Sequence, residues 1–273
     1  MPDINTFIQT VKLPVMPEAA HALIRTLNDE DADVVTVRDI IAKDPVLTTT
    51  LLRMANSALF GLSRSVTTLD SAVSVVGMSQ IRARALGICL AQVFTLPAGV
   101  NRLEFWRYSM VCAGYAKFLA NEVQIDEQQA WLTAMMLRLG EVIIAQHQPD
   151  LWDTMEKRPC APGQRWQRER TAVGFDEGQV TAAVAKRWDF PDEVVQALGH
   201  GADALAATQV SKLCAVVHLA GWLADQADNH ASVQQAVPAI PAALLAYLRL
   251  QPDALLAQLP DPEQFSDVSA LLG

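Results

Sequence analysis

The chain has 273 residues, of which 51% are hydrophobic and 19% are charged, a composition typical of a folded globular protein and unlike that of a disordered chain. Its longest apolar runs are shorter than the roughly 20 residues of a membrane span, so no transmembrane helix is expected. The net charge of −9 is concentrated toward the end, where residues 188–273 carry 2 basic and 10 acidic side chains, and this disfavours nucleic-acid binding.

The first part of the chain shows helix-start signals at short intervals. Pro17 opens a helix that ends in the acidic run of residues 28–33, which is predicted to be a solvated loop. Thr36 and Asp39 resemble a capping box for the next helix, although Asp replaces the usual Glu or Gln. Asp44-Pro45 then supplies an N-cap and a first-turn proline for a third helix.

Glycine and proline divide the next stretch. Thr68 is predicted to cap a short helix, and Gly77 breaks it before another helix begins. Residues 96–99, Leu-Pro-Ala-Gly, mark a boundary. We therefore predict an N-terminal helical subdomain over residues 1–97 and a second helical subdomain, with a C-terminal extension, over residues 98–273.

The second half of the chain continues the helical pattern. Apolar residues follow the 3.6-residue period around residues 108–119 and from Glu127 onward, and they predict two antiparallel helices. Residues 157–170 contain prolines, a glycine and five basic residues, and we predict an exposed basic loop. The period-two alternation of β-hairpins is missing from the sequence, so the predicted fold is all-α, a multi-helical bundle.

The signatures of several enzyme classes are missing from the sequence. It contains no glycine-rich phosphate loop and no Gly-x-Ser-x-Gly. None of the five histidines is followed by Asp, and none forms a His-Glu-x-x-His pair. The four cysteines form no Cys-x-x-Cys pair, and together with a start that lacks a secretory signal they predict a reduced, cytoplasmic protein.

Several motifs in combination resemble those of one bacterial domain family, the HDOD family, which is a helical relative of HD-type metal phosphohydrolases. The resemblance extends over roughly residues 12 to 225. The motifs are Leu13-Pro14-Val15-Met16-Pro17, Asp44-Pro45-Val46-Leu47, Leu52-Arg53-Met54-Ala55-Asn56-Ser57-Ala58-Leu59-Phe60-Gly61, Leu69-Asp70-Ser71-Ala72-Val73, Phe105-Trp106-Arg107, Gly174-Phe175-Asp176, Lys186-Arg187-Trp188 and Phe190-Pro191.

The resemblance implies a regulatory module of bacterial signalling with a degenerate His-Asp site. The first His ligand of the HD enzymes falls on Tyr108 of this sequence, their His-Asp pair falls on Leu137-Arg138, and further ligand positions fall on Glu177 and Gly221. Leu137 offers no lone pair, and the guanidinium of Arg138 would repel a divalent cation. We therefore expect no bound metal, no other cofactor and no catalytic residue.

A few polar residues remain as candidate contacts for a ligand or a partner. One pair lies at a predicted helix end, where capping of the backbone is favoured over ligand binding. Two arginines flank the helix after Gly77 and are either anion-binding or simply solvated. The candidates are Asn56, Ser57, Arg82, Arg84, Arg138 and His200.

Three functions from different classes are consistent with the sequence. The leading hypothesis is a non-enzymatic signalling or scaffold protein that binds a signalling partner in a groove between its N-terminal helices and the degenerate half. The second is a sensor of a nucleotide second messenger, in which Arg138 and His200 would bind the anion in the vacated metal pocket. The third is a residual metal-dependent phosphohydrolase.

Overall fold

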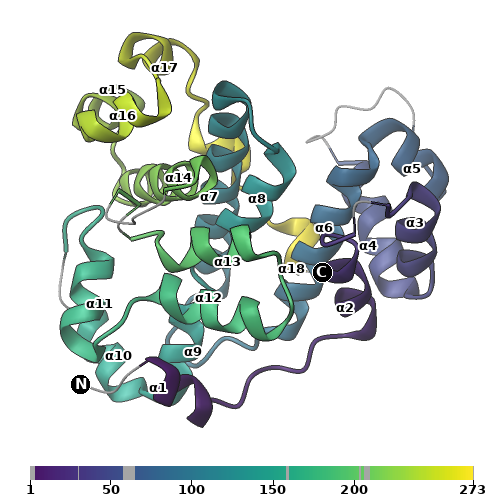
Figure 1. Cartoon of the computed structure of the whole chain (residues 1–273), viewed down its shortest axis with the longest axis horizontal. Helices are drawn as coiled ribbons and strands as arrows, with labels where there is room; N and C mark the ends of the chain where they lie inside the picture. The colour runs from purple at the N-terminus through teal and green to yellow at the C-terminus, as the bar shows by residue number, and fades with distance from the viewer. Residues whose placement is uncertain are drawn as a thin grey trace. The chain divides into compact units, whose positions relative to one another are not determined.

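The computed structural model describes residues 4–29, 31–57, 65–157, 160–202, 204–205 and 210–272. Every regular element within these ranges is an α-helix or a short 3-10 helix (Figure 1). The all-α prediction is therefore confirmed. The predicted helix starts at Pro45 and Glu127 coincide with the starts of helices, because each follows an aspartate that caps the helix.

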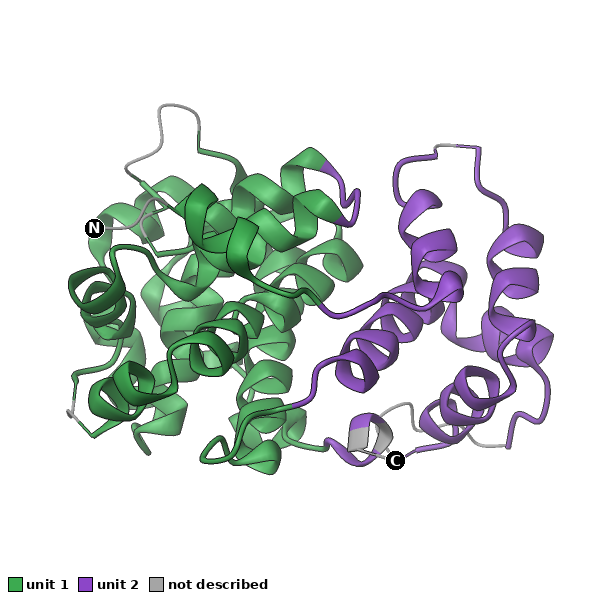
Figure 2. Ribbon diagram, turned by 90° about the horizontal axis from the view of Figure 1, so that it is seen from below, with its two compact units in different colours: residues 1–13, 96–187, 192–267 green, residues 14–95, 188–191, 268–273 purple. Residues whose placement is uncertain are grey.

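The helices form two compact units, which Figure 2 shows in green and purple. Unit 1 comprises residues 1–13, 96–187 and 192–267, and unit 2 comprises residues 14–95, 188–191 and 268–273. The predicted domains, 1–97 and 98–273, differ from this division at both ends of the chain, at residues 96–97 and at residues 188–191. The first helix belongs to unit 1, where Arg187 Nη1 donates to the carbonyl of Ile8 at 3.3 Å, and the last helix belongs to unit 2.

Unit 2 is organised around α6, which packs against the other helices of the unit. Asp44 caps α4 as predicted, since its carboxylate accepts hydrogen bonds from the backbone N–H groups of Val46 and Leu47, both at 3.0 Å. The helices of this unit are α2 (Glu18–Arg25), α3 (Val34–Ala42), α4 (Pro45–Ala55), α5 (Leu69–Val76), α6 (Met78–Val93) and α18 (Ser269–Leu272).

The start of α3 corrects a prediction. The capping box at Thr36 is wrong, because α3 begins at Val34 and its N-cap is Asp33, which the sequence placed in a loop. The Asp33 carboxylate accepts the backbone N–H of Thr36 at 2.7 Å. A charged acceptor at the positive end of a helix is a stronger cap than a threonine hydroxyl, and this explains the earlier start.

Unit 1 is built on α7, which packs against α8 and α14, while α12 packs against α9 and α13. Asn101, Asp126 and Ser211 cap the starts of α7, α8 and α14 with their side chains. The helices are α1 (Ile4–Thr10), α7 (Arg102–Val123), α8 (Glu127–Met136), α9 (Leu139–His147), α10 (Pro149–Glu156), α11 (Arg165–Val173), α12 (Glu177–Arg187), α13 (Asp192–Gly199), α14 (Lys212–Asp228), α15 (Val233–Ala236), η1 (Val237–Ala239), α16 (Ala242–Leu248), α17 (Pro252–Gln258) and η2 (Pro262–Phe265).

The length and apolar character of the helices bear on whether one of them could cross a membrane. Within the described ranges, no single helix is both long and apolar enough to cross a membrane. Only α5 and α6 taken together reach the required length and composition, and they are bent by 116° where they meet.

Asn56 joins the end of α4 to the segment that leads into α5. Its amide nitrogen donates to the carbonyls of Leu52 at 2.8 Å and Val66 at 2.7 Å, and its amide oxygen accepts the N–H of Val66 at 2.8 Å and the hydroxyl of Ser65 at 3.0 Å. The side chain therefore caps the helix. A role of Asn56 as a ligand contact stays a prediction.

These hydrogen bonds predict a cost for the Asn56→Ala substitution. We expect the free energy of unfolding to fall by about 1 kcal/mol, because two part-buried hydrogen bonds between the end of α4 and Val66 are lost. Urea denaturation of the full chain measures this loss in the free energy of unfolding. The matched control is Asn28→Ala, which removes one exposed hydrogen bond to the carbonyl of Asp189. Equal losses in the two variants would contradict the prediction.

Candidate functional site

The five positions at which the resemblance predicts replaced metal ligands lie together in unit 1. The Tyr108 hydroxyl donates to the carbonyl of Gly221 at 3.2 Å, and the guanidinium of Arg138 lies 4.5 Å from the centre of the Tyr108 ring. A Cβ atom at Gly221 would lie 3.0 Å from the Leu137 side chain. Glu177 joins them in the first turn of α12, as the contacts of Arg165 show.

Arg165, in the first turn of α11, lies among three carboxylates. Its Nη2 is 3.2 Å from Glu177 Oε1 and 3.9 Å from Asp225 Oδ1. Its Nη1 is 3.8 Å from Glu141 Oε2, and Glu141 also pairs with Arg138. We call these five residues the ion-pair cluster. Because the side chain of Arg165 is 9% exposed and that of Glu177 is fully buried, the charges are balanced by one another rather than by water.

Neutral side chains complete the cluster by donating hydrogen bonds. The Tyr108 hydroxyl donates to Asp225 Oδ1 at 2.7 Å, and Trp166 Nε1 donates to Glu177 Oε1 at 2.9 Å. The guanidinium of Arg165 also lies 5.0 Å from the centre of the Tyr108 ring, a cation–π distance. Burial raises the pKa of Tyr108 well above its ordinary value, so its hydroxyl stays a donor.

Close packing of α9 and α12 holds the backbone that carries Arg138, Glu141 and Glu177. A Cβ atom at Gly140 would lie 2.0 Å from the carbonyl oxygen of Glu177, so only glycine permits this approach. The N–H of Gly140 donates to the Thr181 hydroxyl at 2.7 Å, and that hydroxyl donates to the Glu177 carbonyl at 2.9 Å. The backbone next to Arg138 is thereby held against the first turn of α12.

The carboxyl groups of Glu141 and Glu177 in the cluster, and that of Glu169 beside it, differ in the direction of their pKa shifts. Burial raises the pKa of Glu177 to about 7, and the charge of Arg165 acts in the opposite direction. Burial and the nearby charge of Glu177 raise the pKa of Glu169 well above its ordinary value. Burial alone would also raise the pKa of Glu141, but Arg138 and Arg165 lower it. The number of negative charges in this region therefore depends on pH.

A cavity of about 450 Å³ in unit 1 has Tyr108 in its wall. Because Tyr108 also binds Asp225, one side chain connects the cavity with the ion-pair cluster. The charged residues of the wall comprise three carboxylates and one guanidinium, so the cavity favours a cationic ligand over an anionic one. They are Glu104, Asp228, Glu263 and Arg107.

The other predicted contact residues lie elsewhere. Arg82 Nη1 donates to the carbonyl of Thr26 at 2.7 Å, at the end of α2. Arg84 is buried on the same helix, α6, and burial lowers its pKa to about 9. Ser57 follows the cap residue Asn56 and is half-buried, whereas His200 is exposed after α13. Their roles in ligand binding stay predictions.

Sequence reasoning missed Arg165, Trp166 and Asp225. The prediction of an exposed basic loop over residues 157–170 is wrong from residue 165 onward, because α11 begins at Arg165 and buries its side chain, while residues 158–159 lie outside the described residues. Gln164 precedes the helix and makes no side-chain cap, so the usual signal of a helix start is missing. Glu141 could have been found, since it lies three residues after Arg138 at the spacing of a helical ion pair.

The residues of this site do not fit a divalent metal ion. Leu137 supplies no donor atom, and the guanidinium of Arg165 already lies among the carboxylates that would have to bind the metal. In the described part of the chain, no group of three or more His, Cys, Asp or Glu side chains is arranged to hold a metal ion. That the protein binds no metal in solution stays a prediction.

The fold and the site define a class of protein, a helical domain whose central carboxylates are paired with arginines from the same chain. The sequence model of the HDOD domain matches residues 13–203, which is more than half of the chain. The chain therefore belongs to the HDOD family, and the resemblance seen in its motifs is confirmed.

Individual relatives are distant. An uncharacterized protein of Treponema pallidum (strain Nichols) is 23% identical over 255 residues, which cover 89% of this chain and 47% of that protein, so the chain spans about half the length of this relative. A crystal structure from Shewanella amazonensis SB2B, named as a candidate phosphohydrolase, has a TM-score of 0.81 with 22% identity and covers 98% of this chain and 97% of its own. A candidate signal transduction protein from Marinobacter aquaeolei VT8 has a TM-score of 0.76 with 19% identity over 98% of this chain and 63% of its own.

Removal of the central cation should destabilise the fold. We expect Arg165→Met to lower the free energy of unfolding by about 3 to 5 kcal/mol, because it leaves buried carboxylates without their counter-charge. The matched control is Arg107→Met, which breaks an ion pair with Glu263 whose side chains are 50% and 68% exposed. That control should cost less than about 1 kcal/mol in the same urea denaturation. A small loss in both variants would contradict the prediction.

The raised pKa of Glu177 also predicts a pH dependence of stability. Between about pH 4.5 and pH 7 the folded chain holds a proton on Glu177 that the unfolded chain has released, so stability falls as the pH rises through this window. Glu177→Gln should remove this contribution, which is on the order of 3 kcal/mol, while keeping an acceptor for Trp166.

Thermal unfolding measured from pH 4.5 to pH 8 tests this pH dependence. The difference in stability between Glu177→Gln and the wild type should grow in favour of the variant across the window. Glu263→Gln, at a carboxylate whose side chain is 68% exposed, serves as the control and should leave the pH profile unchanged. Parallel profiles for the wild type and Glu177→Gln would show that the buried carboxyl does not titrate there.

Proposed function

We propose that the chain is a regulatory protein of bacterial signal transduction that acts by binding a signalling partner protein and performs no catalysis. Membership of the HDOD family and the structural likeness to a candidate signal transduction protein support a regulatory role. The ion-pair cluster is the observation that carries the proposal. Its carboxylates are each paired with an arginine, which occupies the place where a catalytic cation would have to lie.

A residual phosphohydrolase has less support. Metal-dependent hydrolysis needs a cation with an open coordination position that lowers the pKa of a bound water. A guanidinium has no such position, and the one on Arg165 faces Glu141, Glu177 and Asp225. A substrate phosphate would also meet these carboxylates, which repel it. The name of the Shewanella structure is the argument in favour of this alternative.

A sensor of a nucleotide second messenger also has less support. Arg138, its proposed anion-binding residue, pairs with Glu141 and lies over the Tyr108 ring, so its charge is already balanced. The cavity next to Tyr108 has more carboxylates than basic groups in its wall, which repels phosphate. His200 is exposed.

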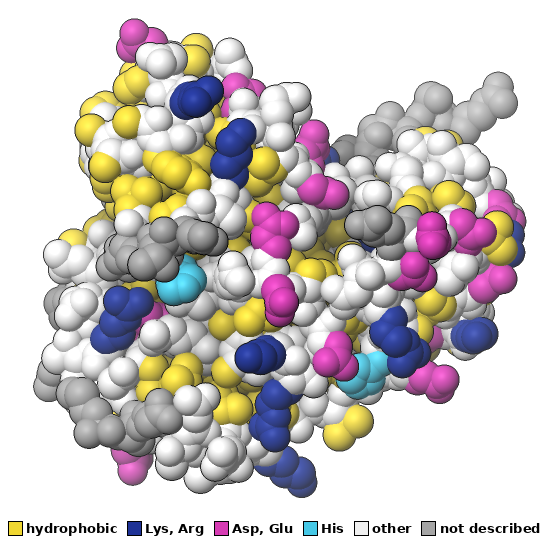
Figure 3. All heavy atoms as spheres, viewed as in Figure 1, with side chains coloured by type: hydrophobic (Ala, Val, Ile, Leu, Met, Phe, Trp, Pro, Cys, Tyr) yellow, Lys and Arg dark blue, Asp and Glu magenta, His cyan; other side chains and the backbone are white. Residues whose placement is uncertain are grey.

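The surface charge favours a protein as the partner. On the face drawn in Figure 3, dark blue Lys and Arg side chains are interspersed with magenta Asp and Glu side chains and with yellow apolar ones. Among the described residues, this face has no continuous basic patch of the kind that nucleic acids and anionic lipids select for, and its apolar side chains are available to a protein partner. We propose neither a nucleic-acid nor a membrane partner.

The absence of catalysis is tested on the purified full chain. We expect elemental analysis to find no stoichiometric Fe, Mn or Zn, and we expect no phosphate release from nucleotides or cyclic dinucleotides with or without added Mn²⁺. Stoichiometric metal together with turnover that a chelator abolishes would contradict the proposal. A saturable thermal shift with a nucleotide, without turnover, would favour the sensor.

Protein binding is tested separately. The full chain is cross-linked to its neighbours in its own host cells, and each recovered protein is purified and titrated against the full chain by calorimetry. We expect a saturable complex of fixed stoichiometry with at least one signalling protein. If no recovered protein binds the purified chain, protein binding as the mode of action is wrong.

A further inference from the structure

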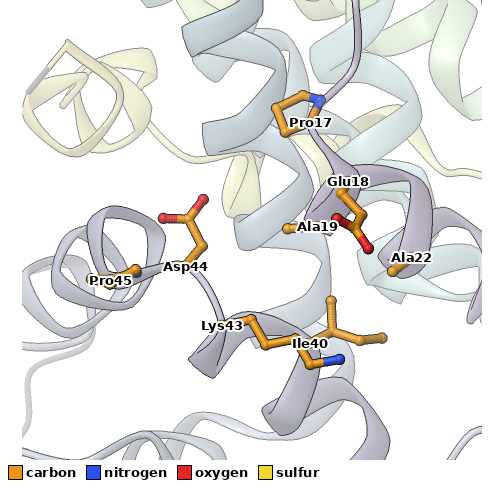
Figure 4. A pocket seen from close by; sticks show the side chains of 8 residues that line it. All are labelled: Pro17, Glu18, Ala19, Ala22, Ile40, Lys43, Asp44 and Pro45. Carbon is orange, nitrogen blue, oxygen red and sulfur yellow. The ribbon is translucent and has the colours of Figure 1, made fainter.

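A second cavity lies in unit 2, among α2, α3 and the start of α4. It has a volume of about 310 Å³, and we call it the three-helix pocket. Figure 4 shows that Glu18 and Asp44 approach it from opposite sides, from α2 and from the start of α4, while Ile40 and Lys43 come from the end of α3. The lining residues are Pro17, Glu18, Ala19, Ala22, Ile40, Lys43, Asp44 and Pro45.

The pocket has a small apolar floor and a charged rim. Ala19, Ala22 and Ile40 are half-buried, so their apolar surface is available to a side chain that enters from outside. The rim holds two carboxylates, those of Glu18 and Asp44, against one ammonium group. Its net charge is therefore negative, which complements a basic group.

The pocket unites two sequence motifs that are far apart in the chain. Pro17 ends the first of the motifs that resemble the HDOD family, and Asp44-Pro45 begins the second. Beside the lining residues, each motif also exposes an apolar side chain, Val15 at 90% and Val46 at 63%. The capping role of Asp44 and the first-turn position of Pro45 explain the start of α4, but they do not explain these two exposed valines.

We propose that the three-helix pocket is the docking site for a segment of the partner protein that presents one apolar side chain followed by a basic residue. This inference rests on the proposed function. A volume of about 310 Å³ is at the lower end of ligand pockets, so it suits one anchoring side chain rather than a nucleotide. The apolar anchor fills the floor, and the basic residue pairs with Glu18 and Asp44, the arrangement of an interface hot spot with a polar rim.

Three defined peptides test the pocket on the full chain. The probes are acetyl-Ala-Leu-Arg-Ala-amide, the same peptide with Glu in place of Arg, and the same peptide with Ala in place of Leu. Binding is followed by the amide chemical shifts of the isotope-labelled protein. We expect saturable shifts around Ala19, Ala22 and Ile40 for the first peptide. Binding of each of the other two should be at least about fivefold weaker.

Matched variants separate the pocket from the rest of the surface. Ala22→Phe fills the floor and Glu18→Lys reverses a charge of the rim, and both should abolish or weaken the shifts. Val75→Phe is the control, because Val75 is 57% exposed on α5 and does not line the pocket. Circular dichroism verifies that each variant is folded, and Glu18→Lys keeps the test valid if Ala22→Phe does not fold.

The outcomes distinguish this inference from the proposed function. Shifts outside the pocket, an equal response to the Arg and Glu peptides, or no shifts at all would overturn the pocket as the docking site. The same holds if a partner recovered by cross-linking binds Ala22→Phe, Glu18→Lys and the wild type equally, and in that case protein binding itself stands. Failure to recover any partner contradicts the proposed function and, with it, this inference.

Discussion

The charge of Arg165 buried in unit 1 is the constraint on which the site depends. A guanidinium removed from water must be surrounded by opposite charge and by hydrogen-bond partners, or the fold loses several kcal/mol. Four helices meet this requirement: α9 contributes Glu141, α12 contributes Glu177, α14 contributes Asp225 and α7 contributes the ring of Tyr108. The charge of Arg165 is therefore compensated only when these helices pack together.

The two guanidinium groups of the cluster do not balance all of the carboxyl groups around them. Two arginines lie among four carboxyl groups, so full ionisation would leave an excess of two negative charges in a region shielded from water. Burial raises the pKa of two of these carboxyl groups, those of Glu169 and Glu177. Protonation of the two groups would remove the excess negative charge.

Local signals in the sequence predicted much of the fold but only part of the site. Asp44 and Thr68 act over two or three residues, so their caps were correctly predicted, and the family motifs marked positions that do meet around Tyr108. Arg165 was missed because its partners are distant in sequence: Asp225 lies far along the chain, and nothing near Arg165 marks it as buried. The local sequence does not distinguish a solvated arginine from a buried one, because the carboxylates that pair with a buried arginine come from other helices.

The two units differ in which side chains they bury and which they expose. In unit 1 the five residues of the ion-pair cluster are paired with one another and largely shielded from water. Among the described residues, the exposed large hydrophobic side chains are concentrated in the smaller unit 2, and they include Val15, Val46 and Val75. Exposed apolar surface next to a charged rim costs solubility unless a partner covers it. A division in which unit 1 provides stability and unit 2 provides the proposed recognition accounts for both observations, because the buried charges of unit 1 are held by one another while the apolar side chains of unit 2 stay exposed.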